Sequence, residues 1–116
     1  MRFVSLFTHA EKGRPPTADE MAKMGKLIND GMKEGWLIAT EGVQTGSIGV
    51  RVQSSGGKIT VTDGPFAEAK EVIGGYALLR AKSKEEVVAL ARRFLGVAGD
   101  GSCEIHALFE PPGSAE

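Results

Sequence analysis

The chain is poor in residue types on which several classes of protein depend. Its 116 residues include one cysteine, Cys103, which excludes an internal disulfide and fits a reducing cytoplasm. The formal net charge is only −1. A charge this small gives no electrostatic reason to expect a nucleic acid or an anionic membrane as a partner, so we expect neither.

Long apolar runs are also missing. The N-terminal apolar stretch spans residues 3–7, which is shorter than the apolar core of a signal peptide and far shorter than a membrane span. The two histidines and the single cysteine lack zinc-ligand spacing, and the glycines cluster in hairpin turns and form no phosphate-binding motif. The sequence therefore predicts a small cytoplasmic protein with no metal and no cofactor.

What is present is the composition of an ordinary globular domain. Hydrophobic residues make up 41% of the chain and charged residues 25%. A domain of this length buries roughly two thirds of the surface that its unfolded chain exposes. No repeat, low-complexity tract or linker divides the sequence, so we assign residues 1–110 to a single domain and residues 111–116 to a loose C-terminal tail.

The hydrophobic pattern predicts strands and two helices. Thr17 with Glu20 forms a capping box that begins the first helix, Gly35 is a plausible stop, and Ser83 begins the second helix in the same way. Residues 96–101 are expected to be a flexible connection. The predicted strands cover residues 3–7, 36–40, 48–53, 58–62, 71–81 and 103–109. The apolar stripes of the helices are Met21, Met24, Leu27, Ile28 and Met32 in the first and Val87, Leu90, Ala91, Phe94 and Leu95 in the second.

This order of elements predicts an α+β fold, a ferredoxin-like split βαβ sandwich with an extra hairpin in its middle. Two helices can cover only one face of such a sheet. Phe3 and Phe7 point to one face while Val4 and Leu6 point to the other, so both faces are apolar. An apolar face without a helix calls for a partner, and the commonest solution is an isologous homodimer.

The most informative segment is Asp63-Gly64-Pro65-Phe66-Ala67-Glu68-Ala69-Lys70-Glu71, which follows the strand at 58–62. Asp, Gly and Pro each favour a turn for a different reason: a side-chain cap, a positive φ and a locked φ. The segment resembles the signature of the YCII-related family, in the branch often called DGPF-domain proteins. Other segments resemble the family's arginine-bearing strand and hairpin, its glycine-aromatic strand and its last strand: Ser47–Arg51 with Gly56–Thr62, Val72–Leu79, and Gly101–Ile105.

The resemblance covers nearly the whole chain. It implies a dimeric α/β barrel, in which the sheets of two copies face each other. It implies no defined reaction, because the family itself lacks one. Related barrel folds host isomerases and cofactor-free monooxygenases, and DGPF-like domains resemble proteins associated with alternative sigma factors in bacteria.

Asp63 and His9 are the candidate catalytic residues. Asp63 ends a strand, where its carboxylate either acts as an acid/base or ligand-fixing group or simply caps the turn. The resemblance places it on the acidic position of the signature, which is suspected of lining the site. His9 continues the alternation of Phe3, Ser5 and Phe7. It either exchanges protons beside a carboxylate such as Asp63 or is an ordinary loop histidine.

Further candidates for ligand binding come from the signature and from neighbouring strands. They are Gly64, Pro65, Phe66, Glu68, Lys70, Arg51 and Tyr76. Each has a plain structural alternative: Phe66 is a hydrophobic plug, Arg51 forms a salt bridge, and the charged signature residues form surface ion pairs contributing about 0–1 kcal/mol each.

Glu104 and His106 are the last candidates. They share one face of the predicted final strand, opposite Cys103, Ile105, Ala107 and Phe109. If the apolar set packs under the helices, Glu104 and His106 point to the barrel side and line a polar pocket; otherwise they form a surface patch. The family's pattern more often has an arginine where His106 stands, which leaves an anion-binding role for that position in doubt.

Two functional hypotheses follow. In the first, the protein is a cofactor-independent enzyme that binds a small polar organic molecule in a barrel pocket, with Asp63 and His9 moving protons. In the second, it is a non-catalytic ligand-sensing or regulatory module, linked to sigma-factor-dependent transcription. No substrate-defining motif decides between them.

Overall fold

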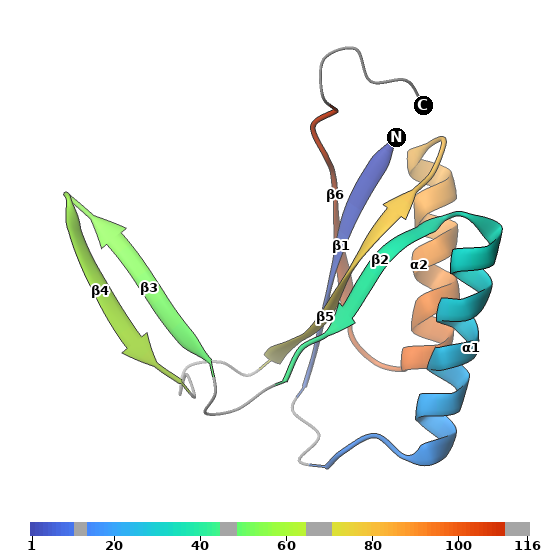
Figure 1. Ribbon diagram of the computed structural model, residues 1–116, viewed down its shortest axis with the longest axis horizontal. Helices are drawn as coiled ribbons and strands as arrows, with labels where there is room; N and C mark the ends of the chain where they lie inside the picture. Colours follow the sequence, from blue (N-terminus) through green and yellow to red (C-terminus); the bar gives the residue numbers. More distant parts are fainter. Residues whose placement is uncertain (11–13, 45–48, 65–70, 111–116) are drawn as a thin grey trace.

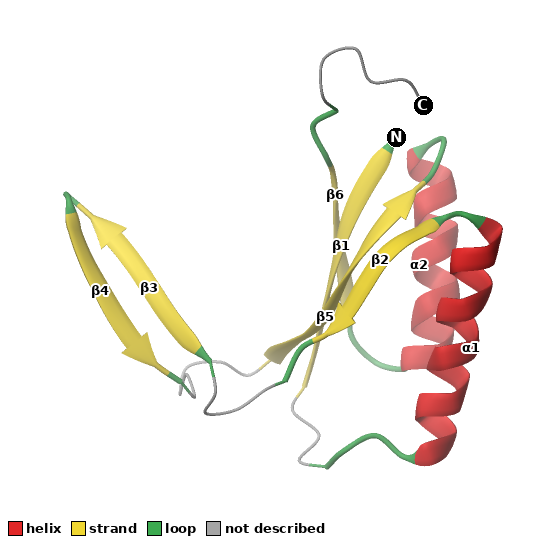
Figure 2. Ribbon diagram, viewed as in Figure 1, coloured by secondary structure: helices red, strands yellow, loops and turns green. Residues whose placement is uncertain are grey.

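The computed structural model describes residues 1–10, 14–44, 49–64 and 71–110. Within these ranges it contains six strands and two helices (Figures 1 and 2). Neither helix described has the length and hydropathy that a membrane crossing requires. The elements in chain order are β1 (Arg2–Ala10), α1 (Ala18–Glu34), β2 (Leu37–Gly42), β3 (Val50–Ser55), β4 (Lys58–Asp63), β5 (Glu71–Arg80), α2 (Lys84–Ala98) and β6 (Ser102–Ala107).

The main sheet has four strands in the order β2-β5-β1-β6, and each neighbouring pair is antiparallel. Each βαβ unit of this sheet is split by a strand of the other, as in a ferredoxin-like fold. Figure 2 shows both helices on the same face of the sheet. The α+β class and the helix-free second face are therefore confirmed, and so is the extra hairpin, which is β3 paired with β4. The dimeric barrel stays a prediction.

The helix ends are where the local sequence places them. Thr17 caps α1: its hydroxyl accepts from the Glu20 N–H at 3.1 Å, and the Thr17 N–H donates to the Glu20 carboxylate at 2.8 Å. Gly35 ends the helix with φ 86°, a left-handed conformation that favours glycine. Ser83 caps α2 by accepting from the Glu86 N–H at 3.1 Å.

Two predicted boundaries near the C-terminus are wrong. Residues 96–98 belong to α2, which continues to Ala98. The predicted connection at 96–101 therefore begins only after residue 98. The last strand ends at Ala107, and the Phe109 side chain is 100% exposed instead of packed under the helices. The reason is the length of the neighbouring strand: β1 begins at Arg2, whose carbonyl accepts from the Leu108 N–H, so β6 has no partner farther along.

The dense part of the core lies at one end of the sheet. Its buried residues are Phe3, Leu37, Leu79, Ala81 and Val87. Trp36 packs beside this cluster, and it fits only because Gly31 has no side chain: a Cβ there would lie 2.8 Å from the indole ring. The first-helix stripe is only partly buried, since Leu27 is buried whereas Met21 and Met32 are 58% and 45% exposed.

The carboxylate of Glu20 links the start of α1 to the preceding loop. It accepts two hydrogen bonds from the Arg14 guanidinium, at 2.8 and 3.2 Å, as well as the Thr17 N–H. The guanidinium first, and the Thr17 amide second, lower the pKa of Glu20 from 4.5 to about 2. A lowered pKa means that the folded state prefers the ionised form, so the stabilisation is complete above pH 4.5 and is lost as the pH falls toward 2.

We therefore predict that Glu20→Gln flattens the acid branch of the stability curve. Chemical denaturation of wild type and variant at pH values between 7 and 2 is the measurement. The difference between them should be largest at neutral pH and shrink between pH 4.5 and 2. Glu85→Gln, in the first turn of α2, is the control, because no ion pair to Glu85 is seen in the part of the chain described here. An equal difference at every pH would contradict the prediction.

Candidate functional site

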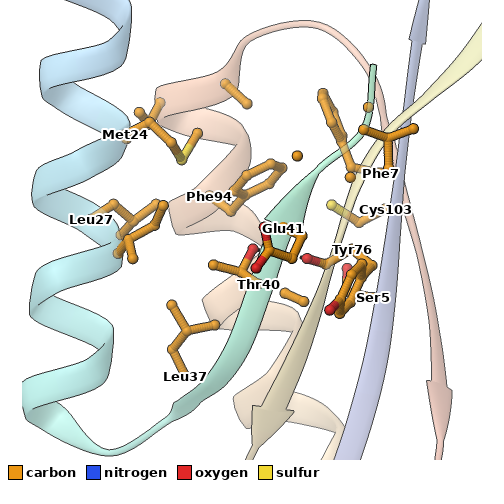
Figure 3. Close-up of a pocket in the computed structure, with 18 of the residues that line it drawn as sticks. Ser5, Phe7, Met24, Leu27, Leu37, Thr40, Glu41, Tyr76, Phe94 and Cys103 are labelled. Carbon is orange, nitrogen blue, oxygen red and sulfur yellow. Dashed lines mark hydrogen bonds between the residues drawn. The ribbon is translucent and has the colours of Figure 1, made fainter. Parts of the chain in front are cut away.

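A cavity of about 710 Å³ lies between the sheet and the helices, and its lining extends from Leu37 and Leu79 of the dense core to His9 near the end of β1 (Figure 3). Cavities of this size bind small organic molecules, typically with mostly apolar walls and a few polar groups. The helices supply an apolar roof and the strands a floor of smaller residues. The roof includes Met24, Leu27, Ile28, Leu90, Phe94 and Val97, and the floor includes Ser5, Phe7, Thr40, Gly75, Ala77 and Cys103.

The floor is low because small residues face each other across neighbouring strands. Ser5 on β1 lies opposite Ala77 on β5, and in the next pair only Phe7 has a side chain, because its partner is Gly75. One row farther toward the core, Phe3 and Leu79 fill the same space with large side chains. Packing on the larger residues holds the helices at one distance from the sheet. The small residues therefore leave space between the sheet and the helices.

A β-bulge shapes the open end of this floor. The register of β1 with β5 shifts between Phe7 and Thr8, and Gly74 is the residue of β5 left without an opposite partner. The His9 ring lies over Gly74: a Cβ on that glycine would be 2.6 Å from His9 Cδ2 and 2.8 Å from Nε2. Only glycine lets the imidazole lie this close to the strand.

Aromatic contacts hold the His9 ring in place. Its centroid lies 5.3 Å from that of Phe7, with the planes inclined by 31°. Phe7 in turn meets Phe94 of α2 edge to face, with centroids 5.0 Å apart and planes at 81°. Such pairs stabilise by about 0.5–1.5 kcal/mol beyond the area that they bury. The contacts tie the histidine at the end of β1 to the helix layer.

The tautomer of neutral His9 follows from its hydrogen bond. Nδ1 lies 2.7 Å from the carbonyl oxygen of Ala10, and a carbonyl can only accept, so Nδ1 donates its hydrogen. In the neutral ring Nε2 then carries the lone pair. His9 is one of the residues that line the cavity. The sequence prediction that His9 emerges beside the face carrying Phe3, Ser5 and Phe7 is confirmed.

The other polar groups of the cavity are weaker candidates for chemistry. The Thr40 hydroxyl donates to the main-chain oxygen of Tyr76 at 2.8 Å. Burial raises the pKa of the Cys103 thiol, and a hydrogen bond with Ser5 offsets only part of that rise. A thiol with a raised pKa stays protonated at neutral pH and is a poor nucleophile. Among the described residues, no group of three acidic, histidine or cysteine side chains is arranged to hold a metal ion.

The predicted partner of His9 lies elsewhere in the fold. Asp63 is the last residue of β4, and its side chain is exposed on the hairpin. No hydrogen bond or ion pair joins Asp63 to His9 within the ranges that the structure describes. Gly64 follows at the base of the hairpin, where its N–H donates to the Gly49 carbonyl at 2.7 Å. Arg51 is on β3, opposite Thr62.

The remaining predicted residues that the structure describes lie on the helix-free face of the sheet. Glu104 and His106 are exposed on β6, 3.4 Å apart, and the alternation along the strand puts them on the helix-free face; whether they line a pocket between two copies stays a prediction. Tyr76 pairs with Leu6 of that same face, while its main-chain oxygen receives the Thr40 hydroxyl. Pro65, Phe66, Glu68 and Lys70 lie outside the described residues.

The sequence analysis did not anticipate a cavity on the helix-covered face. The signal for it was present in the strands, where Ser5, Gly75 and Ala77 interrupt an otherwise bulky apolar surface. Recognising it requires the pairing of β1 with β5, because only the register shows that these small residues are neighbours.

Gly74→Ala should damage the site without touching the dense core. The added Cβ would meet His9 and Phe7 at 2.6–2.9 Å, so one of the rings must move, at a cost of about 1–3 kcal/mol. Thermal unfolding measures the loss, and the His9 ring signals in a proton NMR spectrum should shift. Gly25→Ala is the matched control, since nothing lies within 4 Å of its position and alanine favours a helix by about 1 kcal/mol. A Gly74→Ala protein as stable as wild type, with unchanged His9 signals, would disprove the arrangement.

Comparison with known proteins supports the resemblance in the sequence. A search of curated proteins finds no match for this chain. A scan of family models matches the YCII-related domain over residues 1–110, which includes both helices, the four-stranded sheet and the hairpin. The match therefore spans His9, the floor of the cavity and Asp63 alike. On this coverage, the chain belongs to the YCII-related family.

Proposed function

We propose that this protein binds a small organic molecule in the cavity beneath α1 and α2, with His9 at the polar end of the site. The observation that carries the proposal is that His9, whose Nδ1 is hydrogen-bonded to the Ala10 carbonyl, is among the residues that line a 710 Å³ cavity. Binding sites are commonly apolar cavities in which a few polar groups fix the orientation of the ligand.

The side chains that line the cavity indicate which kind of ligand it would bind. The Met24, Leu27 and Phe94 side chains favour an apolar body, and Nε2 of His9 favours a group that can donate a hydrogen bond or a proton. A neutral imidazole whose Nδ1 carries the hydrogen can accept a proton at Nε2, so His9 is suited to act as a general base toward an acidic C–H, N–H or O–H bond. No cofactor is required for such a proton transfer.

Asp63 defines the second candidate site. The resemblance in the sequence places it on the acidic position of the signature, and Asp63 is exposed at the end of β4. A ligand fixed by Asp63 would lie at the hairpin and not under the helices. Because Asp63 is on β4 and His9 on β1, the two candidate sites can be tested with separate variants.

A thermal-shift screen of small metabolites tests the location. A ligand at about 100 times its dissociation constant stabilises the native state by about 2.7 kcal/mol, which moves the midpoint by several degrees for a domain of this size. We expect the shift to disappear in Ala91→Phe, which fills the cavity from α2, and to persist in Ala89→Phe, whose position on the same helix is exposed. Persistence in Ala91→Phe combined with loss in Asp63→Asn would move the site to the hairpin.

His9→Gln then separates catalysis from sensing. Glutamine keeps a hydrogen-bonding group but cannot take up a proton at neutral pH. If the protein is an enzyme, the compound found in the screen should be converted by wild type and not by His9→Gln, although both bind it. If wild type binds the compound without converting it, the cavity is that of a ligand-sensing module, and the general-base role of His9 is wrong.

A further inference from the structure

The cavity under the helices extends along the axis of α1. Its lining includes Glu20 in the first turn of α1 and, at the other end, Trp36, whose indole ring packs at Gly31. Glu20 and Gly31 are eleven residues apart, which corresponds to about 16 Å along a helix axis. Figure 3 shows Met24, Leu27 and Leu37 following one another in this direction. The cavity is therefore about 16 Å long.

A cavity of this length is narrow for its volume. Spread over about 16 Å, the volume of 710 Å³ gives a mean width of about 6–7 Å, whereas a round cavity of equal volume would be about 11 Å across. Carbon atoms in contact lie about 3.5–4.0 Å apart, so a hydrocarbon chain is about 4 Å wide. The shape therefore favours a chain laid lengthwise over a round molecule of the same volume.

Arg14 is the cation at the end of the cavity near the start of α1. Its Nη1 donates to the Pro15 carbonyl at 3.1 Å and to the Glu20 carboxylate at 2.8 Å, and its Nη2 donates to Glu20 at 3.2 Å. A guanidinium has five N–H donors. Among the residues that the structure describes, these are the hydrogen bonds of Arg14, so two donors are left for an oxygen of a ligand. Because Arg14 and Glu20 neutralise each other, that oxygen needs no net charge.

Trp36 forms the wall at the opposite end. Its Nε1 donates to the Glu34 carboxylate at 2.8 Å, the Arg93 guanidinium lies 5.4 Å from its ring centroid, and a Cβ on Gly31 would be 2.8 Å from the ring. Trp36 also lines a second cavity, of about 440 Å³. The indole is thus held from three directions between two cavities, and it limits how far a ligand can extend.

We propose that the ligand is an unbranched aliphatic chain with a carbonyl-bearing head, a fatty acid or its amide. The carbonyl oxygen accepts from Arg14, and the end of the chain lies against Trp36. This inference rests on the proposed function, to which it adds the class and orientation of the ligand. An extended chain advances about 1.2 Å per bond, as an extended polypeptide does, so about 13 bonds span the cavity. Trp36 then determines the preferred chain length.

The first test measures how affinity depends on chain length. Wild type is titrated in a calorimeter with saturated fatty acids from octanoic to octadecanoic acid, each below its micelle concentration. Each added CH₂ group should tighten binding about fourfold up to about tetradecanoic acid, and longer acids should bind more weakly. Trp36 is the only tryptophan in the chain, so its fluorescence should change with tetradecanoic acid and not with octanoic acid. An affinity that does not depend on chain length would overturn the proposal.

The second test locates the two ends of the ligand. Arg14→Gln should weaken tetradecanoic acid and tetradecanamide by at least about tenfold and leave tetradecanol, which has no carbonyl, unchanged. Lys26→Gln is the matched control, because Lys26 forms an exposed ion pair with Asp30 on the same helix. Trp36→Ala should move the preferred length to longer chains. Unchanged binding of the acid and the amide in Arg14→Gln would overturn the proposal.

Ala91→Phe separates this inference from the proposed function, because it fills the cavity from α2. Loss of the fatty acid in this variant supports both. If compact molecules bind wild type and not Ala91→Phe, while neither a fatty acid nor an amide binds, the proposed function stands and the inference about the chain is wrong. Equal binding of tetradecanoic acid to wild type and Ala91→Phe would place the chain outside the cavity and overturn this inference.

Discussion

The structure depends on a central strand, β1, that is apolar on both faces. Its odd-numbered residues, from Phe3 to His9, form the floor beneath the helices, and its even-numbered residues Val4 and Leu6 form the centre of the opposite face. Both faces of such a strand must be removed from water, but the chain has only two helices and both lie on one face. The covered face contains the cavity, and the uncovered face is the basis of the prediction that the protein forms a dimer.

Along the covered face, side-chain size determines where the protein is packed and where it is hollow. Phe3 and Leu79 fill the space beneath α2 at one end, whereas Ser5 with Ala77 and then Gly75 leave it open toward the other. The bulge at Gly74 lies at the end where the side chains are small. Because Gly74 has no side chain, the His9 ring can lie directly over its backbone. Bulges are common next to functional sites because they redirect a side chain without changing the rest of the sheet.

Much of the fold could be predicted because its signals are local. Thr17, Glu20 and Gly35 define α1 through hydrogen bonds and a backbone conformation that involve only their near neighbours. Gly56 and Gly57 likewise define the hairpin turn, with φ values of 57° and 82°. The candidate site was harder to predict from the sequence. His9 was expected on the correct face, because alternation along a strand is also local, but its neighbours Gly74 and Phe94 come from distant parts of the chain.

The sequence by itself determined the elements, the α+β class, the family and the presence of two apolar sheet faces. These follow from residue periodicity and turn chemistry, which act over a few residues. Only the tertiary structure decided that the cavity lies under the helices, that His9 borders it, and that Asp63 stands apart on the hairpin. The physical reason is the register of β1 with β5: it brings small residues together across the sheet, and no local pattern encodes which strand lies next to which.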